Sequence, residues 1–264
     1  MRQREPIGIF DSGLGGLSVL LEIEQLMPDR DIVYVADSAH VPYGTKSPEF
    51  IRNRSLAITT FLVEVLRSET VVVACNTATT HAVGTLRERF TSTPIVGMEP
   101  ALKPAAAATR SGIVGVLATP ATLLGERFVE LVQRYTDGIE LLTQPSPGLV
   151  ERVEAGELDG PETERLLRLY TEPMLARGAD TIVLGCTHYP FLADTLRRIV
   201  GPSVTLIDTG AAVARQTARV LGQEVGPPDR GHHVASASSP AGMSEGQVTF
   251  YSSGDTSLAS SSRA

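Results

Sequence analysis

Cysteine and lysine are scarce in this sequence, and each scarcity excludes a class of site. The two cysteines, Cys75 and Cys186, have no CxxC spacing, so they cannot build a closed zinc site. A structural disulfide between them is not expected in a reducing compartment. The two lysines, Lys46 and Lys103, stand away from the strand-like segments that carry the cysteines. Because pyridoxal phosphate needs a suitable lysine, we do not expect that cofactor. We also expect no metal, because the cysteines have no companion cluster of Cys or His ligands.

The sequence also lacks an excess of basic residues and a long apolar run. Its 264 residues carry a formal net charge of −7 with a pI near 5.3, so the attraction that supplies most nonspecific nucleic-acid binding is missing. No apolar run approaches the roughly 18 residues that span a bilayer. The opening segment MRQREPIGIF has no signal-peptide pattern. We therefore expect a cytoplasmic protein that binds neither nucleic acid nor membrane.

What the sequence does contain is an alternation of short apolar runs with longer amphipathic segments. The runs begin at residues 7, 32, 71, 94, 113, 139, 181 and 204. Between several of them lie helical patterns, such as those of residues 17–27 and 47–66. This alternation is typical of βα units, so we expect an α/β fold with mainly parallel sheets.

The second half of the chain repeats features of the first half. Four pairs of segments match in the same order, two at a shift of 107 residues and two at a shift of 111: 8–12 with 115–119, 32–37 with 139–144, Cys75 with Cys186, and 94–98 with 205–209. This repeat predicts two similar α/β lobes related by an approximate two-fold axis, with the active site in the cleft between them. The first lobe is expected to comprise residues 1–98 plus 210–264, and the second residues 99–209.

Near the C-terminus the sequence changes character. From Gly222 to Gln247 it is rich in glycine, proline and serine and has no periodicity, which indicates a loop. We expect His232 and His233 in this loop to be solvated side chains rather than metal ligands. The following segment, residues 248–254, is expected to form the last strand.

Both cysteines stand where an apolar run ends and a helical segment begins. In parallel α/β sheets, ligands bind beyond the carboxyl ends of the strands, and a helix N-terminus there lowers a thiol pKa from about 8.5. If the lobes face each other, Cys75 and Cys186 approach a bound molecule from opposite sides. This arrangement suits inversion at a carbon acid, in which one thiolate removes a proton and the opposite thiol delivers one. The alternative is that both are inert core thiols.

The glycine-rich segment DSGLGGLS, residues 11–18, raises the question of a dinucleotide site, with Asp37 at the end of the next apolar run. Ser18 stands where the third glycine of that fingerprint belongs, so nicotinamide binding is not expected. Asp11 and Ser12 end the first strand on the sheet edge that carries Cys75. We expect Asp11 to orient a substrate ammonium or assist proton movement and Ser12 to take up a carboxylate, although a helix N-cap is the alternative for Asp11.

Six motifs occur in one order over nearly the whole chain: FDSGLGGLSV at 10–19, PYG at 42–44, ACNTAT at 74–79, PGLVERVEAG at 147–156, GCTHYP at 185–190 and FYSSGD at 250–255. Taken together they are highly specific. By these motifs the sequence resembles the glutamate racemases of the cofactor-independent aspartate/glutamate racemase superfamily. The short segment before Ile7 argues against the activator-dependent members that carry an N-terminal extension.

The resemblance implies interconversion of L- and D-glutamate, which supplies D-glutamate for bacterial peptidoglycan. It implies that Cys75 acts on the D-enantiomer and Cys186 on the L-enantiomer, and that a homodimer is an option. Asp11 and His188 would support the cysteines, with Glu154 as a further candidate and Glu151 as its alternative. The implied substrate contacts are Asp11, Ser12, Tyr43, Gly44, Asn76, Thr77, Thr187 and His188.

Two other functions stay open. One is racemisation of aspartate or another amino acid by a member of the same superfamily. The other is a two-lobed small-molecule binding protein in which both cysteines are structural. His81, six residues past Cys75, is expected to be structural in either case.

Overall fold

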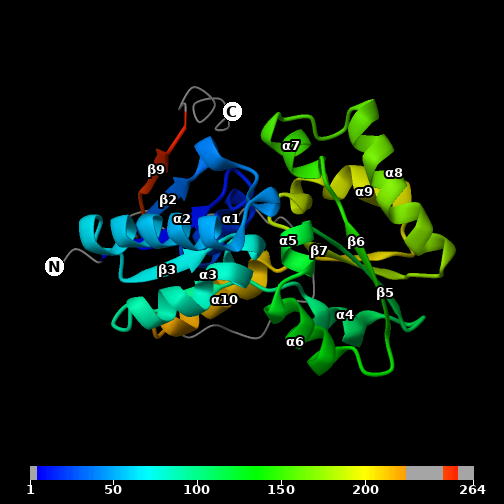
Figure 1. Cartoon of the computed structure of the whole chain (residues 1–264), viewed down its shortest axis with the longest axis horizontal. Coiled ribbons are helices and arrows are strands. Elements are labelled where there is room, and N and C mark those ends of the chain that lie inside the picture. The colour runs from blue at the N-terminus through cyan, green and yellow to red at the C-terminus, as the bar shows by residue number, and fades with distance from the viewer. Residues whose placement is uncertain (1–4, 224–245, 255–264) are drawn as a thin grey trace.

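Two parallel sheets, each flanked by helices, lie in separate halves of the molecule (Figure 1). The computed structural model describes residues 5–223 and 246–254. The first sheet has the strand order β4-β3-β1-β2-β9 and the second has the order β6-β5-β7-β8, with every pairing parallel. The predicted α/β fold with two similar, mainly parallel lobes is confirmed.

The elements follow the alternation expected from the sequence. The strands are β1 (Ile7–Asp11), β2 (Ile32–Ala36), β3 (Thr70–Val73), β4 (Ile95–Gly97), β5 (Ile113–Ala118), β6 (Glu140–Pro145), β7 (Thr181–Gly185), β8 (Thr205–Ile207) and β9 (Val248–Ser252). The α-helices are α1 (Leu17–Leu26), α2 (Pro48–Thr60), α3 (Asn76–Arg89), α4 (Leu102–Ala108), α5 (Pro120–Leu123), α6 (Glu126–Tyr135), α7 (Leu149–Glu154), α8 (Pro161–Ala176), α9 (Ala193–Val200) and α10 (Gly210–Val220). Short 3₁₀ turns occupy Ser38–His40, Tyr43–Thr45 and Tyr189–Leu192, and a π turn, Phe61–Val65, extends α2.

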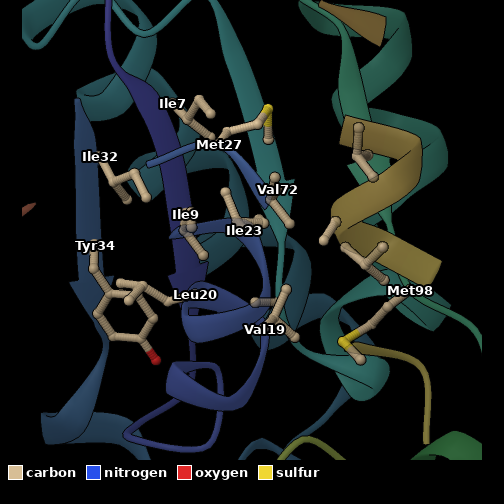
Figure 2. Packing of buried hydrophobic residues seen from close by; sticks show 14 of the residues in the cluster. Ile7, Ile9, Val19, Leu20, Ile23, Met27, Ile32, Tyr34, Val72 and Met98 are labelled. Atoms are coloured by element: carbon tan, nitrogen blue, oxygen red, sulfur yellow. The ribbon is translucent and has the colours of Figure 1, made fainter. Parts of the chain in front are cut away.

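Burial of both faces of the first sheet explains its continuous apolar strands. Successive residues of a strand face opposite sides, so Ile7 and Ile9 pack beneath α1 while Phe10 belongs to the core beneath α2 and α3. On α1, Val19 and Ile23 lie four residues apart on one helix face and pack against β1 (Figure 2). Helix α10 lies beside α1 on this face, although it is remote in sequence.

The second sheet is covered in the same way. Val114 and Val116 of β5 pack in the core formed with α4 and α6. Leu117 packs in the opposite core, which contains side chains from α7, α8 and α9. Each sheet is thus a layer between two layers of helices, and each half of the molecule has its own apolar cores.

Strand register supports most of the predicted repeat and corrects one part of it. Gly8 lies opposite Val71 in the first sheet, and Gly115 lies opposite Ile182 in the second, which reproduces the shifts of 107 and 111 residues. The other neighbour of Gly8 is Val33, whereas that of Gly115 is Leu142. The second strand is therefore displaced by 109 residues, so the predicted shift of 107 was wrong there. Strand β6 is a half-exposed sheet edge, and its apolar pattern fixes the register only weakly.

After the second sheet the chain returns to the first half. Strand β9 pairs in parallel with β2, so the expected last strand is confirmed. His232 and His233 lie outside the described residues. Within residues 5–223 and 246–254, no helix combines the length and the apolar character needed to cross a membrane.

Candidate functional site

The carboxyl ends of the two sheets meet, and several hydrogen bonds join them. Thr77, after β3, pairs with Thr119, after β5, at 2.9 Å between hydroxyl oxygens. The Leu14 amide donates to Glu154 Oε1 at 2.7 Å, and the Ser18 hydroxyl donates to the Thr187 carbonyl at 3.0 Å. The loops expected to carry the chemistry therefore come together from both halves.

Cys75 lies two residues after the last residue of β3 and is the N-cap residue of α3. Its side chain is buried, and its Sγ lies 4.0 Å from the hydroxyl oxygen of Ser12. Burial raises the pKa of the Cys75 thiol well above its ordinary value, and the charge of Asp11 raises it further. The hydrogen bond with the Ala78 backbone lowers the pKa of the Cys75 thiol, whereas the nearby Cys186 raises it. The helix N-terminus alone therefore does not make Cys75 a ready thiolate, contrary to the simple sequence argument.

Cys186 stands at the end of β7 and begins a line of polar groups. Its Sγ lies 3.7 Å from Nδ1 of His188, and Nε2 of His188 lies 2.6 Å from Oε1 of Glu154. Burial by itself lowers the pKa of His188, but its hydrogen bonds with Cys186 and Glu154 raise it, and the net direction is well upward. His188 therefore places a positively charged imidazole beside the Cys186 sulfur.

Asp11 and Ser12 lie on the Cys75 side of the site. Asp11 is fully buried, and its Oδ2 accepts a hydrogen bond from the Gly16 amide at 2.9 Å. Ser12 donates to the other oxygen, Oδ1, at 3.3 Å. The N-cap residue of α1 is Gly16, so Asp11 is not itself the cap, although it holds the start of that helix. The negative charge of Asp11 also raises the pKa of Cys75, where burial is the larger effect. It raises the pKa of His188 as well, where burial and the hydrogen bonds with Cys186 and Glu154 are the larger effects.

Asn76 has an unusual environment for a buried amide. Its side chain is buried, and among the described residues neither Nδ2 nor Oδ1 has a hydrogen-bond partner. Because buried amides are normally paired, this one is available to a ligand that brings its own donors and acceptors. An amino acid, with a carboxylate and an ammonium group, meets both needs.

The PYG segment reaches the site from the first half. The Tyr43 hydroxyl donates to Asp37 Oδ2 at 2.6 Å, and Arg54 binds both oxygens of the same carboxylate. Burial alone raises the pKa of Asp37, but the bonds from Arg54 and Tyr43 bring it down to about 2. A Cβ on Gly44 would lie 2.8 Å from Cβ of Thr119, so glycine allows this segment to touch the second half.

Sequence reasoning missed two parts of this arrangement. The hydroxyls of Thr119 and Thr122 surround that of Thr77, at 2.9 and 3.3 Å. The 107-residue shift carries Ser12 onto Thr119, so the repeat contained the signal for that residue. The Asp37–Arg54 pair had no comparable signal, because the two residues come from different segments.

His81, expected to be structural, lies with Nε2 3.0 Å from the Ala121 carbonyl oxygen.

The structure also separates the two glutamates of the VERVEAG motif. Glu154 contacts His188, whereas the side chain of Glu151 is exposed on the same helix, α7. Among the described residues, no three His, Cys, Asp or Glu side chains are grouped as ligands for a metal ion. What the arrangement offers is two buried thiols at equivalent strand ends, each beside other polar groups.

A family model for Asp/Glu/hydantoin racemases matches residues 7–217 of the chain. The chain belongs to this family. A glutamate racemase of Ectopseudomonas mendocina (strain ymp) is 54% identical over 255 residues, which cover 96% of this chain and 91% of that protein. One of Stutzerimonas stutzeri (strain A1501) is 50% identical over 250 residues, covering 95% of this chain and 89% of the relative.

Solved structures agree with the sequence relatives. Escherichia coli glutamate racemase, in complex with L-glutamate and an activator, is similar with a TM-score of 0.77 and 41% identity, covering 84% of this chain and 85% of that one. A glutamate racemase isoform from Bacillus anthracis has a TM-score of 0.81 at 27% identity, covering 97% of this chain and 91% of the other. The two-lobed fold is therefore that of racemases in this family.

Proposed function

We propose that this protein interconverts L- and D-glutamate without a cofactor, using Cys75 and Cys186 as the two proton-transfer groups. The observation that carries the proposal is the pair of buried thiols at equivalent strand ends of the two sheets. Each thiol has its own neighbours, Ser12 and Asp11 for Cys75, and His188 for Cys186. The similarity to glutamate racemases over most of the chain selects glutamate as the substrate.

The proposed reaction breaks one carbon–hydrogen bond and forms another. Starting from L-glutamate, the Cys186 thiolate removes the proton from Cα, so that an S–H bond forms and the electron pair of the C–H bond stays on carbon. The Cys75 thiol then gives its proton to the opposite face of Cα and becomes a thiolate. The product is D-glutamate, and the reverse reaction exchanges the duties of the two cysteines.

The supporting roles follow from the contacts. The protonated His188, held by Glu154, stabilises the Cys186 thiolate before the first step. Asp11 lies on the other side, where its charge acts on Cys75 and His188 and suits the substrate ammonium. Each cysteine thus has a charged neighbour, His188 for Cys186 and Asp11 for Cys75.

The proposed substrate contacts are those of the two sheet edges. The unpaired amide of Asn76 suits the α-carboxylate, and hydrogen bonds to this group also stabilise charge that develops on Cα. The Tyr43 hydroxyl is committed to Asp37, so we assign that segment's contact to the backbone of Tyr43 and Gly44. The remaining contacts come from Ser12, Thr77, Thr187 and His188, which are buried at the same edges.

The wider setting belongs to the same proposal. D-glutamate made by this reaction would serve peptidoglycan synthesis, as in the family that the motifs resemble, and the protein would act in the cytoplasm. We divide it into lobes of residues 1–98 plus 210–264 and 99–209, a division supported by the packing of α10 on α1 and of α4 with α6. The exposed apolar side chains of Leu124 and Val129 offer a surface for a second copy of the chain.

Circular dichroism of L-glutamate with the purified enzyme, without added cofactor, tests the activity, and L-aspartate serves as the parallel substrate. The glutamate signal should decay to zero, and Cys75→Ser and Cys186→Ser should each abolish the decay, because a hydroxyl is far too weak an acid to supply a base near neutral pH.

Heavy water tests the two-base mechanism. Early D-glutamate formed from L-glutamate should carry deuterium at Cα almost completely, while the remaining L-glutamate carries little. Substantial protium in the early product, or near-normal racemisation by either serine variant, would refute the assignment of the two cysteines.

A further inference from the structure

The loop of Gly13, Leu14 and Gly15 in the first lobe lies against the acid/base line of the second lobe. Oε1 of Glu154 accepts hydrogen bonds from two directions, the Leu14 amide at 2.7 Å and Nε2 of His188 at 2.6 Å. One carboxylate oxygen therefore joins the glycine loop to the imidazole that faces Cys186. This contact connects the two lobes at the proposed proton-transfer group.

The two glycines of this loop are needed for close approach. A Cβ built on Gly13 would meet Oε1 of Glu154, and one on Gly15 would meet Nδ1 of His188, both closer than 3.0 Å, a distance that Cβ atoms essentially never show. Neither glycine has the positive φ that favours this residue for conformational reasons. Their small size thus serves the neighbouring side chains of the second lobe rather than a turn.

The chemistry at this contact depends on charge as well as space. The Leu14 amide holds Oε1 of Glu154 in place, and the hydrogen bond of the same oxygen with His188 raises the pKa of the imidazole. Nδ1 of that imidazole lies 3.7 Å from Sγ of Cys186. The Leu14 amide is thus the first member of a series that ends at the second-lobe cysteine.

We propose that the Gly13–Leu14–Gly15 loop is a positioning element that fixes Glu154 and His188 from across the lobe boundary and so holds the imidazole in place beside Cys186. This inference rests on the proposed function, because it assigns a role in proton transfer at Cys186. It adds a contribution from the first lobe to the cysteine of the second lobe.

Gly15→Ala is the most direct perturbation, because the added methyl group displaces the His188 ring from its place beside Cys186. A displacement of about 1 Å in a catalytic arrangement costs on the order of 10²-fold in rate, so we expect a fall of this size in kcat/KM. The fall should be equal in the two directions, since enantiomers have the same free energy and the equilibrium constant stays at unity.

Isotope effects distinguish this role from general damage. Glutamate deuterated at Cα reports the Cys186 step when the L-enantiomer is the substrate and the Cys75 step when it is the D-enantiomer. Slower transfer at Cys186 makes that step more rate-limiting, so the isotope effect should rise for L-glutamate and fall for D-glutamate. A merely structural role would leave the ratio of the two isotope effects unchanged.

Gly84→Ala is the matched control, because it is the same substitution in α3 and, apart from the backbone of its own helix and its chain neighbours, no heavy atom lies within 4 Å of the new methyl group. Gly13→Ala is the second test variant. Its methyl group meets the flexible end of Glu154, which can move aside, so the variant should fold even if Gly15→Ala does not. It should show the same asymmetry of isotope effects with a smaller loss of rate.

The outcomes separate this inference from the proposed function. A wild-type protein that does not racemise glutamate removes the proposed function itself. An active wild-type protein whose folded Gly13→Ala and Gly15→Ala variants match Gly84→Ala in rate and in both isotope effects overturns the role of the loop alone. A large loss of rate with an unchanged isotope-effect ratio overturns it as well.

Discussion

Replacing Glu154 by glutamine would remove one negative charge from the site while keeping the shape of the side chain. Oε1 of Glu154 now accepts the bonds from Leu14 and His188 at 2.7 and 2.6 Å. An amide oxygen in the same place can accept both bonds. The substitution therefore isolates the effect of charge on His188 from the effect of geometry.

The expected size of the effect follows from the hydrogen bond that loses its charge. A bond to a charged partner contributes about 1.5–3 kcal/mol and a neutral one about 1 kcal/mol, so the difference is about 0.5–2 kcal/mol. This corresponds to about a 2- to 30-fold lower ratio of protonated to neutral His188, or about one unit in its pKa in the middle of that range. Racemisation should fall by about the same factor on the high-pH limb, where His188 is mostly neutral, and by less at lower pH.

The direction of the pH effect is also fixed. Burial lowers the pKa of His188, and the bonds with Cys186 and Glu154 raise it to a net value well above the ordinary one. Loss of the Glu154 charge moves that pKa down, so His188 loses its proton at lower pH. The high-pH limb of kcat/KM should therefore move to lower pH by about one unit.

The assay is racemisation followed by circular dichroism across pH, with each enantiomer as the starting substrate. Glu151→Gln is the matched control, because Glu151 lies on the same helix with its side chain exposed. It should behave like the wild-type protein, as exposed substitutions usually do. If Glu154→Gln and Glu151→Gln have the same rate and the same pH profile, the assigned role of Glu154 is wrong.

Two further predictions concern the polar groups that support the site. Asp37→Asn should lower the stability of the folded protein by about 2.5 kcal/mol at pH 7, since bonds led by that from Arg54 overcome the opposing effect of burial and hold the Asp37 pKa at about 2 instead of 3.8. A carboxyl group whose pKa is lower in the folded state than in the unfolded state stabilises the fold at a pH above the unfolded-state pKa, and this stabilisation is lost on acidification. Urea unfolding should therefore show about half of the stability difference at pH 3. A stability difference that does not shrink between pH 7 and pH 3 would contradict this prediction. Thr119→Val should lower kcat/KM about tenfold by removing the 2.9 Å partner of the Thr77 hydroxyl, whereas Thr119→Ser should retain most activity. Equal kinetics for the valine and serine variants, with a difference only in thermal stability, would make this hydroxyl structural.

Strand positions and the two-lobed plan could be predicted from the sequence because they depend on local patterns. Apolar runs such as Ile7–Phe10 are buried on both faces of a parallel sheet, so hydrophobicity alone marks them. The repeat located Cys75 and Cys186 at equivalent strand ends, and the register of both sheets agrees with that placement. It failed by two residues at β6, where half-exposed side chains carry little pattern.

Only the tertiary structure decided which of the polar residues meet. Glu151 and Glu154 are equivalent candidates in the sequence, and folding brings only Glu154 within hydrogen-bond distance of His188. The contact of Leu14 with Glu154 spans 140 residues, and that of Arg54 with Asp37 joins two different segments.

Thiol acidity was decided in the same way. A helix N-terminus next to Cys75 predicts a lower pKa, but burial and the nearby charge of Asp11 reverse the direction. Local sequence sets which backbone conformation each segment adopts, because propensity and apolar periodicity act over a few residues. Desolvation and the distances between charges depend on how remote segments pack, so the acid/base state of the site arises only when the two lobes come together.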